Sequence, residues 1–355
     1  MKNLLPSEKE SLQQQVESLL QLLRQDATLR QIDTSLIRSA LDKAISPTFE
    51  IVFAGAFSAG KSMLINALLG RKLLYSAQGH ATGTECYIRY CETPEERVVL
   101  TFLSEVEIRE QVQQLCEQLQ LPGIDNINHS ENVESLKQKA QSILKLEGGE
   151  ARSERAKQAK ALTLLLAGFE ANREKIQTLK NATSSIEEFS TSHINEAAEY
   201  ARRSHNSTVL KRIDYYCHHP LLEDGNIIID TPGIDAPVKT DAEIAYNKIK
   251  NPNTSAVVFV LRTASTGELA VEETELLETI QASSSIRDRV FYLFNQIDTT
   301  WFDDELKKRL DYQIKTQFKE TTRIYKTSGL LGFYSQQVQQ NTDATNRWGL
   351  FNFCR

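Results

Sequence analysis

The sequence has no excess of positive charge. Its 355 residues include 41 Lys and Arg against 47 Asp and Glu, which gives a formal net charge of −6 at pH 7. Proteins that bind nucleic acid usually carry a basic face. The charge balance gives no support for such a partner, and we expect no nucleic acid.

Long apolar runs are also missing. No window holds about 18 uninterrupted apolar residues, the length that a membrane-spanning helix needs. The N-terminal sequence MKNLLPSEKE lacks the long apolar core of a signal peptide. These absences predict a protein that is cytoplasmic or peripheral to a membrane.

Cysteine is sparse and forms no sequence motif. The five cysteines contain no C-x-x-C pair; they are Cys86, Cys91, Cys116, Cys217 and Cys354. This scatter favours reduced thiols in a cytosolic compartment over a disulfide framework or a zinc site.

A phosphate-loop motif stands near the start of the chain. Residues 51–70 read IVFAGAFSAGKSMLINALLG, in which Gly55, Gly60, Lys61 and Ser62 fit G-x-x-x-x-G-K-[ST]. An apolar, β-branched run precedes the motif and a helical pattern follows it, so a chance glycine turn is disfavoured. We expect backbone N–H groups to wrap a phosphate, Lys61 to reach the outer phosphates from a solvent-facing loop, and Ser62 to ligate Mg²⁺.

Helical patterns flank and interrupt the sheet pattern. Residues 7–46 carry two apolar stripes at helical spacing; they either pack on the surface of the nucleotide domain or belong to a helical bundle beside it. Strands are predicted at 86–90 and 98–103, after which helical spacing replaces the sheet pattern over 105–120, 131–147, 150–180 and 186–203. The strongest apolar cluster there, Leu162, Leu165, Leu166 and Phe169, favours a helix-packing core over a membrane or partner face.

The sheet pattern resumes at residue 210. Strands are predicted at 210–217, 226–230, 256–261, 290–294 and 324–327, and helices at 239–250, 268–282 and 301–319. Residues 335–346 are rich in Gln, Asn and Thr and are predicted as loop or frayed helix. Alternating strands and helices predict an α/β fold, in which a mostly parallel sheet is flanked by helices.

Two motifs follow predicted strands, at the sheet edge where α/β proteins bind ligands. Residues 230–233 read DTPG; Asp230 could hold Mg²⁺ through a water, and the Gly233 N–H could reach a γ-phosphate. Residues 295–298 read NQID and resemble the N-K-x-D base-reading motif of GTPases. The Asp298 carboxylate could accept two hydrogen bonds from guanine, a donor pair that adenine lacks.

Two weaker stretches complete the predicted site. Ser328 and Gly329 resemble the short loop that closes over the far side of the base. Residues 75–84 are polar and contain glycine, as in a loop that closes on a ligand. In it, Thr82 is the candidate to complete Mg²⁺ coordination, and Thr84 competes for that role.

As an ordered set, these motifs resemble the dynamin superfamily, and within it the bacterial, especially cyanobacterial, dynamin-like proteins. The residues that carry the resemblance lie at 55–62, 64–70, 79–82, 229–237 and 295–298, within a region of about 49–330. The resemblance implies a P-loop GTPase that uses Mg²⁺ to convert GTP to GDP, dimerises through its nucleotide face and acts on membrane lipids. The lipid-binding part need not lie within this chain.

The resemblance carries site roles over to this sequence. It implies catalytic roles for Lys61, Ser58 and Thr82, and metal binding by Ser62, Thr82 and, through water, Asp230. The predicted nucleotide-binding residues are Ser58, Ala59, Gly60, Lys61, Ser62, Met63, Gly233, Asn295, Gln296, Asp298, Ser328 and Gly329. Asn295 and Asp298 are expected to select guanine, whereas Gln296 replaces the usual Lys and predicts weaker packing on the base.

The sequence departs from the dynamin pattern in two respects. Phe57 occupies a position where eukaryotic dynamins carry Gln, and a phenyl ring cannot orient water by hydrogen bonding. The chain also ends soon after the nucleotide domain. We therefore predict N-terminal helices at 1–47 that resemble a bundle signalling element, a GTPase domain at 48–335 with a helical insertion at about 104–205, and a tail at 336–355 without a stalk.

Two rival functions remain. A GTP-binding assembly scaffold with little hydrolysis is the first, and Phe57 favours it. A ribosome-linked GTPase is the second, and the long helical insertion and the acidic charge count against it.

Overall fold

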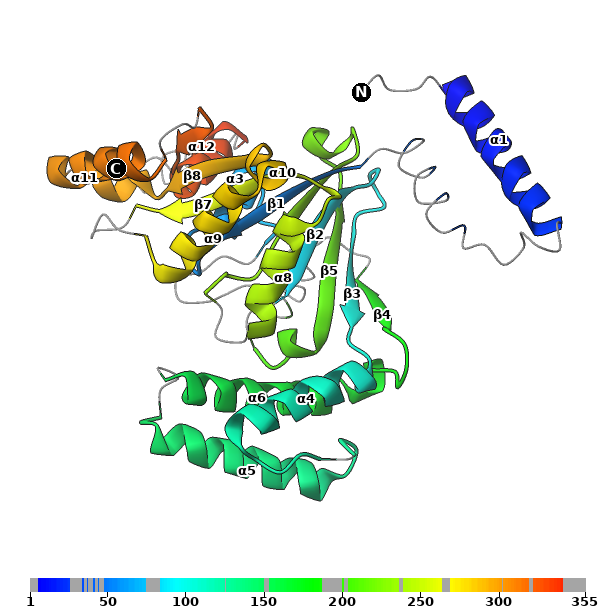
Figure 1. The fold of residues 1–355 in the computed structure, drawn as a ribbon, viewed down its shortest axis with the longest axis vertical. Helices are drawn as coiled ribbons and strands as arrows, with labels where there is room; N and C mark the ends of the chain where they lie inside the picture. Colours follow the sequence, from blue (N-terminus) through cyan, green and yellow to red (C-terminus); the bar gives the residue numbers. More distant parts are fainter. Residues whose placement is uncertain are drawn as a thin grey trace.

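The computed structural model describes residues 6–25, 48–74, 84–124, 126–149, 153–186, 204–235, 239–263, 269–301, 303–318 and 322–340, with single positions at 34, 37, 41, 44 and 200. Its centre is a nine-stranded sheet in the order β4-β3-β5-β2-β6-β1-β7-β8-β9 (Figure 1). The strands are β1 (Phe49–Gly55), β2 (Glu85–Tyr90), β3 (Arg97–Phe102), β4 (Thr183–Ile186), β5 (Leu210–Cys217), β6 (Asn226–Asp230), β7 (Thr254–Arg262), β8 (Val290–Asn295) and β9 (Ile324–Lys326).

The two halves of the sheet differ in strand direction. From β6 through β1, β7 and β8 to β9 every neighbouring pair is parallel. In the other half, β2 pairs parallel with β5, whereas β2 with β6, β3 with β5 and β3 with β4 are antiparallel. The predicted α/β class with a mostly parallel sheet is confirmed. Followed across the sheet, these directions place the end of β3 and the start of β5 at the edge where β1 ends.

Helices cover both faces of the parallel half of the sheet. Successive side chains of its strands point to opposite faces, and apolar side chains lie on both. On one face, Phe53 of β1 packs with Leu64 and Ile65 of α3 (Lys61–Leu69). On the other, Ala54 joins a core built by α8 (Lys239–Lys250), α9 (Val271–Ala282), α10 (Ser284–Arg287) and α11 (Asp304–Gln317). The helix α12 (Gly329–Gln340) contacts α3.

Within its described residues, the predicted insertion contains the helices α4 (Glu105–Leu119), α5 (Ser130–Leu146) and α6 (Glu154–Ala171), which lie beyond the end of β3 (Figure 1). Ser104 begins α4 with a capping box: its hydroxyl accepts the Glu107 N–H, and the Glu107 carboxylate accepts the Ser104 N–H. The apolar cluster of α6 is 0–3% exposed; its members are Leu162, Leu165, Leu166 and Phe169. The interpretation of this cluster as helix-packing core is therefore confirmed.

One prediction of secondary structure was wrong, and another is resolved in favour of one of its alternatives. Residues 183–186 form β4 at the sheet edge, although the sheet pattern was expected to stop throughout this region; the sequence TSSI is too short and polar to give a strand signal. Residues 335–340, which were predicted as loop or frayed helix, continue α12, and this helix contacts α3. This helix runs across residue 335, the predicted end of the GTPase domain.

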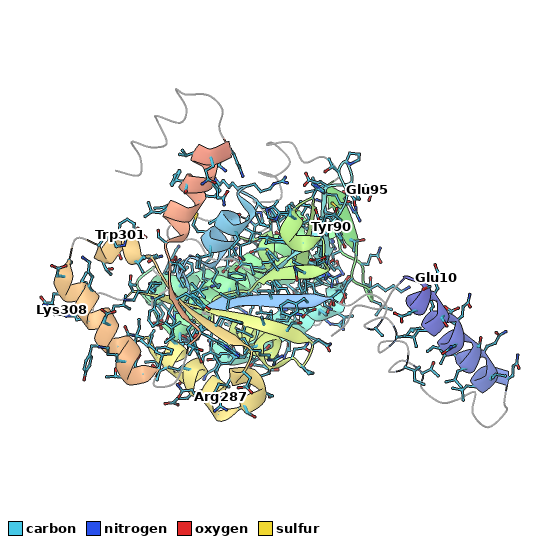
Figure 2. All side chains as sticks on the ribbon, turned by 90° about the horizontal axis from the view of Figure 1, so that it is seen from above. Glu10, Tyr90, Glu95, Arg287, Trp301 and Lys308 are labelled. Carbon is cyan, nitrogen blue, oxygen red and sulfur yellow. The ribbon has the colours of Figure 1, made fainter. Side chains whose placement is uncertain are left out.

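The remaining elements are short or lie apart. The 3₁₀ turns are η1 (Arg173–Lys175), η2 (Ser207–Val209), η3 (Pro220–Leu222) and η4 (Ile297–Thr300). The N-terminal helix α1 (Pro6–Gln25) stands away from the sheet in both views, where Glu10 marks it in Figure 2. That position is unlike a helix packed on the surface of the nucleotide domain. Most of the predicted helix at 26–46, and residues 187–199 of the insertion, lie outside the described residues.

Candidate nucleotide site

The phosphate loop connects the end of β1 to the start of α3. Ser58 (φ +59°) and Gly60 (φ +89°) both adopt left-handed backbone conformations, which turn successive peptide groups inward as an anion-binding nest requires. A Cβ at Gly60 would lie 2.3 Å from Asn295 Nδ2, so only glycine fits there. The N–H groups in the first turn of α3 lack intrahelical acceptors and point out of the helix N-terminus, toward the site.

Lys61 is buried at the start of α3, and the expectation that it sits on a solvent-facing loop was wrong. Its side chain is 7% exposed, and Nζ donates to the carbonyl oxygens of Gly55 at 3.1 Å and Ala56 at 3.2 Å. Burial lowers the pKa of Lys61, and the negative charges of nearby Asp230, Asp235 and Glu273 act in the opposite direction. Lys61 begins α3 and folds back over its own loop, a geometry that the motif alone does not specify.

Ser62 and Asp230 bring two oxygen ligands together. The Ser62 hydroxyl donates to Asp230 Oδ2 at 2.6 Å, and the Asp230 side chain is fully buried at the end of β6. Next to it, Thr231 Oγ1 donates to the Phe53 carbonyl at 2.9 Å, which ties the end of β6 to β1. Hydroxyl and carboxylate oxygens are the donors that Mg²⁺ prefers, so this pair fits the predicted metal.

The turn after β6 lies directly on the phosphate loop. Ile234 N–H donates to the Gly55 carbonyl at 3.2 Å, and Phe57 N–H donates to Asp235 Oδ1 at 2.5 Å. A Cβ at Gly233 would approach Phe57 N to 3.0 Å. Gly233 therefore lies beside the phosphate loop, and its contact with a γ-phosphate stays a prediction. The hydrogen bond between Phe57 and Asp235 was not predicted, although Asp235 lies within 229–237, one of the stretches that carry the family resemblance.

Two successive amide side chains at the end of β8 hold the other half of the loop. Asn295 is 2% exposed; its Nδ2 donates to the Ala59 carbonyl at 2.8 Å, and its Oδ1 accepts the Gly329 N–H at 2.9 Å. Gln296 Nε2 donates to the Ser58 carbonyl at 2.9 Å. Asn295 thus connects the phosphate loop to the start of α12, and Gln296 contacts the loop rather than only lining a base site.

Asp298 presents a buried acceptor. It lies in η4, and its Oδ1 is buried with no hydrogen-bond partner among the residues that the structure describes. A buried carboxylate oxygen without a donor is costly. Ser328 stands at the neighbouring turn, where its Oγ accepts the Leu331 N–H at 3.2 Å and begins α12. The predicted base-side residues lie on two adjacent segments of the chain; they are Asn295, Gln296, Asp298, Ser328 and Gly329.

The remaining predicted residues are placed less fully. Thr82 lies outside the described residues. The competing Thr84 is 3% exposed, and its hydroxyl donates to the Leu210 carbonyl at 3.3 Å, so it ties β2 to β5. Met63 lies half-buried in the first turn of α3.

Asn66 is a residue that sequence reasoning missed. It is 1% exposed in α3; its Oδ1 accepts the N–H groups of Leu73 and Leu74, and its Nδ2 donates to the Leu74 carbonyl. These bonds fix the chain just before residues 75–83. The available signal was a single amide within the apolar run LINALL, because buried polar side chains are normally hydrogen-bonded.

The strand, phosphate loop and helix at this sheet edge define a P-loop nucleotide-binding protein. The model of the dynamin family matches residues 51–297, more than half of the chain. The chain therefore belongs to the dynamin family, a family of GTPases. Dynamin-like protein A of Bacillus subtilis (strain 168) is 25% identical over 288 residues, which make up 81% of this chain and 22% of that protein.

Solved structures show the same fold. Two structures of an oligomerised bacterial dynamin pair, described as a mechanism for long-range sensing and tethering of membranes, align with TM-scores of 0.55 and 0.52. They are 16% and 15% identical and cover 97% and 94% of this chain, but the matched regions are 42% and 41% of their own length. The chain thus spans less than half of the length of these relatives.

Among its described residues, no helix is long and apolar enough to cross a bilayer.

Proposed function

We propose that this protein hydrolyses GTP to GDP and phosphate in a Mg²⁺-dependent reaction. The observation that carries the choice of guanine is the buried Asp298 Oδ1, which has no donor among the described residues. The N1–H and 2-amino groups of guanine form a donor pair that suits such a carboxylate, and adenine lacks that pair.

The phosphate-side residues support the reaction type. Phosphoryl transfer depends mainly on positioning and charge stabilisation. Lys61 would donate to the outer phosphates, and Ser58 and Gly233 would contribute N–H groups. Ser62, Asp230 and Thr82 would hold Mg²⁺, which supplies positive charge against the phosphate oxygens when bound. Water would attack the γ-phosphate in line, without a protein nucleophile.

Phosphate release from GTP tests this proposal. We expect turnover with GTP, little with ATP, and loss of activity when the divalent cation is chelated. A second candidate, a GTP-binding scaffold with little hydrolysis, is favoured by Phe57, whose ring cannot orient water. Tight GTP binding without phosphate release would support the scaffold and contradict the hydrolase.

We further propose that two copies pair through the nucleotide face and that the longer protein remodels membranes. The bacterial dynamin pair named above is an oligomeric, membrane-tethering relative. We predict a monomer without nucleotide and a dimer with a GTP transition-state analogue, and turnover per molecule that rises with protein concentration. Light scattering with and without the analogue measures the mass; an unchanged mass would contradict the pairing.

A further inference from the structure

Asp235 holds the N-terminal half of the phosphate loop from outside it. Its carboxylate Oδ1 accepts the Phe57 N–H at 2.5 Å, across 178 positions of sequence. A hydrogen bond to an ionised acceptor is shorter and stronger than one between neutral groups. The bond therefore makes Asp235 a strong tether between the turn after β6 and the loop.

The tether acts on a peptide unit that is held at both ends. The peptide between Ala56 and Phe57 offers its oxygen to Lys61 Nζ at 3.2 Å and its N–H to Asp235 at 2.5 Å. An ammonium group has three protons, two of which Lys61 already donates to the Gly55 and Ala56 carbonyls, so donation to two phosphate oxygens would remove one of these bonds. Asp235, together with the Ala59 N–H that donates to the Ala56 carbonyl at 3.2 Å, then keeps this peptide in place.

The position of this peptide group affects the next peptide group, which contains the Ser58 N–H. Ser58 follows with φ +59°, a conformation that costs energy for a residue other than glycine. Gln296 holds the Ser58 carbonyl on one side, and Asp235 holds the Phe57 N–H on the other. Together they hold the backbone on both sides of the Ser58 N–H, which would contribute to the nest around the phosphate oxygens.

The same carboxylate also fixes Gly233. A Cβ at Gly233 would lie 2.8 Å from Asp235 Oδ1 and 3.0 Å from Phe57 N, so the carboxylate, the glycine and the loop are in mutual contact. Gly233 is the residue assigned above to the γ-phosphate. A single side chain thus sets the spacing between the loop and the turn that would contact the transferred group.

We infer that Asp235 is a positioning residue for GTP hydrolysis: through its bond to the Phe57 N–H it holds the phosphate loop and Gly233 in one arrangement around the γ-phosphate. This inference rests on the proposed GTPase function. Asp235 acts through the two backbone segments that it joins. The side chain at position 57 cannot form hydrogen bonds. The bond to Asp235 partly compensates for this, because it fixes the backbone at that position.

Two substitutions separate the hydrogen bond from the charge. Asp235→Ala removes the acceptor, whereas Asp235→Asn keeps an oxygen at the same reach and removes the negative charge. We expect Asp235→Ala to lower kcat by about 100-fold, the effect of a small misplacement at a reacting centre. GTP affinity should change by about threefold or less, because the remaining loop contacts persist. Asp235→Asn should recover most of kcat.

The controls address folding and general charge effects. Asp224→Ala removes an exposed Asp in the turn before β6 and should leave kcat unchanged. Thermal unfolding and the stoichiometry of fluorescent GTP binding establish the folded fraction of each variant. With ¹⁵N-labelled phenylalanine, the Phe57 amide resonance should lie downfield in wild type and in Asp235→Asn, and move upfield in Asp235→Ala.

The outcomes are distinct. An unchanged kcat in Asp235→Ala overturns the inference and leaves the GTPase proposal intact. Equal losses in Asp235→Ala and Asp235→Asn would assign the effect to charge, and equal losses of kcat and GTP affinity would assign it to binding; either result overturns the positioning role. A wild-type protein that does not hydrolyse GTP overturns both proposals.

Discussion

The phosphate side and the base side of the proposed site differ in how fully their polar groups are hydrogen-bonded within the protein. On the phosphate side, Lys61 donates to Gly55 and Ala56, and Ser62 donates to Asp230. On the base side, Asp298 Oδ1 is buried with no partner among the described residues. A phosphate that accepts two Lys61 protons would therefore replace an internal bond, whereas guanine would satisfy an acceptor that has no donor among the described residues.

This difference has an energetic consequence. Exchanging one hydrogen bond for another yields little net free energy, whereas supplying a donor to a buried, unpaired acceptor removes its desolvation cost. We therefore expect base-side substitutions to act on nucleotide affinity and choice, and phosphate-side substitutions to act mainly on turnover. The predictions below test this division.

The largest effect is expected from Asp298→Asn. Losing a charge-assisted pair in a buried site costs about 2–5 kcal/mol, which corresponds to about 30- to 4,000-fold weaker GTP binding. Xanthine carries a carbonyl where guanine has its amino group, so the Asn NH₂ can pair with it. The variant should gain xanthosine triphosphate, and ATP should bind poorly to both proteins.

Titration of GTP, ATP and xanthosine triphosphate against both proteins measures this change. Asp304→Asn, at an exposed position of α11, is the matched control. Because the Asp298 charge is partly desolvated without a donor, the variant should unfold no earlier than wild type. Wild-type GTP affinity in Asp298→Asn, or a wild-type preference for ATP, would refute the base-reading assignment.

Lys61→Ala should act mainly on turnover. Removing one preorganised donor from a reacting group costs about 10²–10³-fold in kcat. The buried position of Lys61 adds a structural effect: the Gly55 and Ala56 carbonyls lose a donor, at a cost of up to about 1–3 kcal/mol in stability. Part of that cost is offset because a charge that burial disfavours is also removed.

Phosphate release and urea unfolding, measured on the same samples, separate the two effects. Lys72→Ala, an exposed Lys shortly after α3, controls for general loss of charge. Wild-type turnover in Lys61→Ala would show that Lys61 does not serve the phosphates.

Sequence patterns predicted those strands and helices that are defined by residues adjacent in the chain. The strands Leu210–Cys217 and Asn226–Asp230 have the predicted bounds, because apolar runs with turn residues on each side define them. The helix Lys239–Lys250 also matches its predicted range. The motifs placed Ser62 near Asp230 because the helix that follows the end of β1 begins at the sheet edge where β6 ends.

The contacts that complete the site depend on segments distant in sequence. The bond from Phe57 to Asp235 spans 178 positions, and the bond from Gln296 to Ser58 spans 238. Periodicity describes one element at a time and cannot show which side chain of a loop meets which backbone group of another. For the same reason, the motif identified Lys61 but gave no sign that its side chain folds back onto its own loop.

The smallest effect is expected from Gln296, which belongs to the base-side loop but contacts the phosphate side. Its Nε2 donates to the Ser58 carbonyl at 2.9 Å. A neutral hydrogen bond contributes about 0.5–1.5 kcal/mol net, so Gln296→Ala should weaken GTP binding by about 2- to 12-fold. Gln141→Ala, on the exposed surface of α5, is the control.

Gln296→Lys sharpens the comparison of the two sides. A lysine is long enough to reach the same carbonyl, and a charged donor forms a stronger bond, of about 1.5–3 kcal/mol. Its positive charge would also lie near the bound phosphates. We therefore expect Gln296→Lys to bind GTP as tightly as wild type or more tightly, with guanine preference unchanged because Asp298 is untouched. Calorimetric titration with GTP and ATP measures the GTP affinity and the preference for guanine. If Gln296→Ala binds GTP as tightly as wild type, the contact with Ser58 does not support the phosphate loop. The two sides of the site would then act independently.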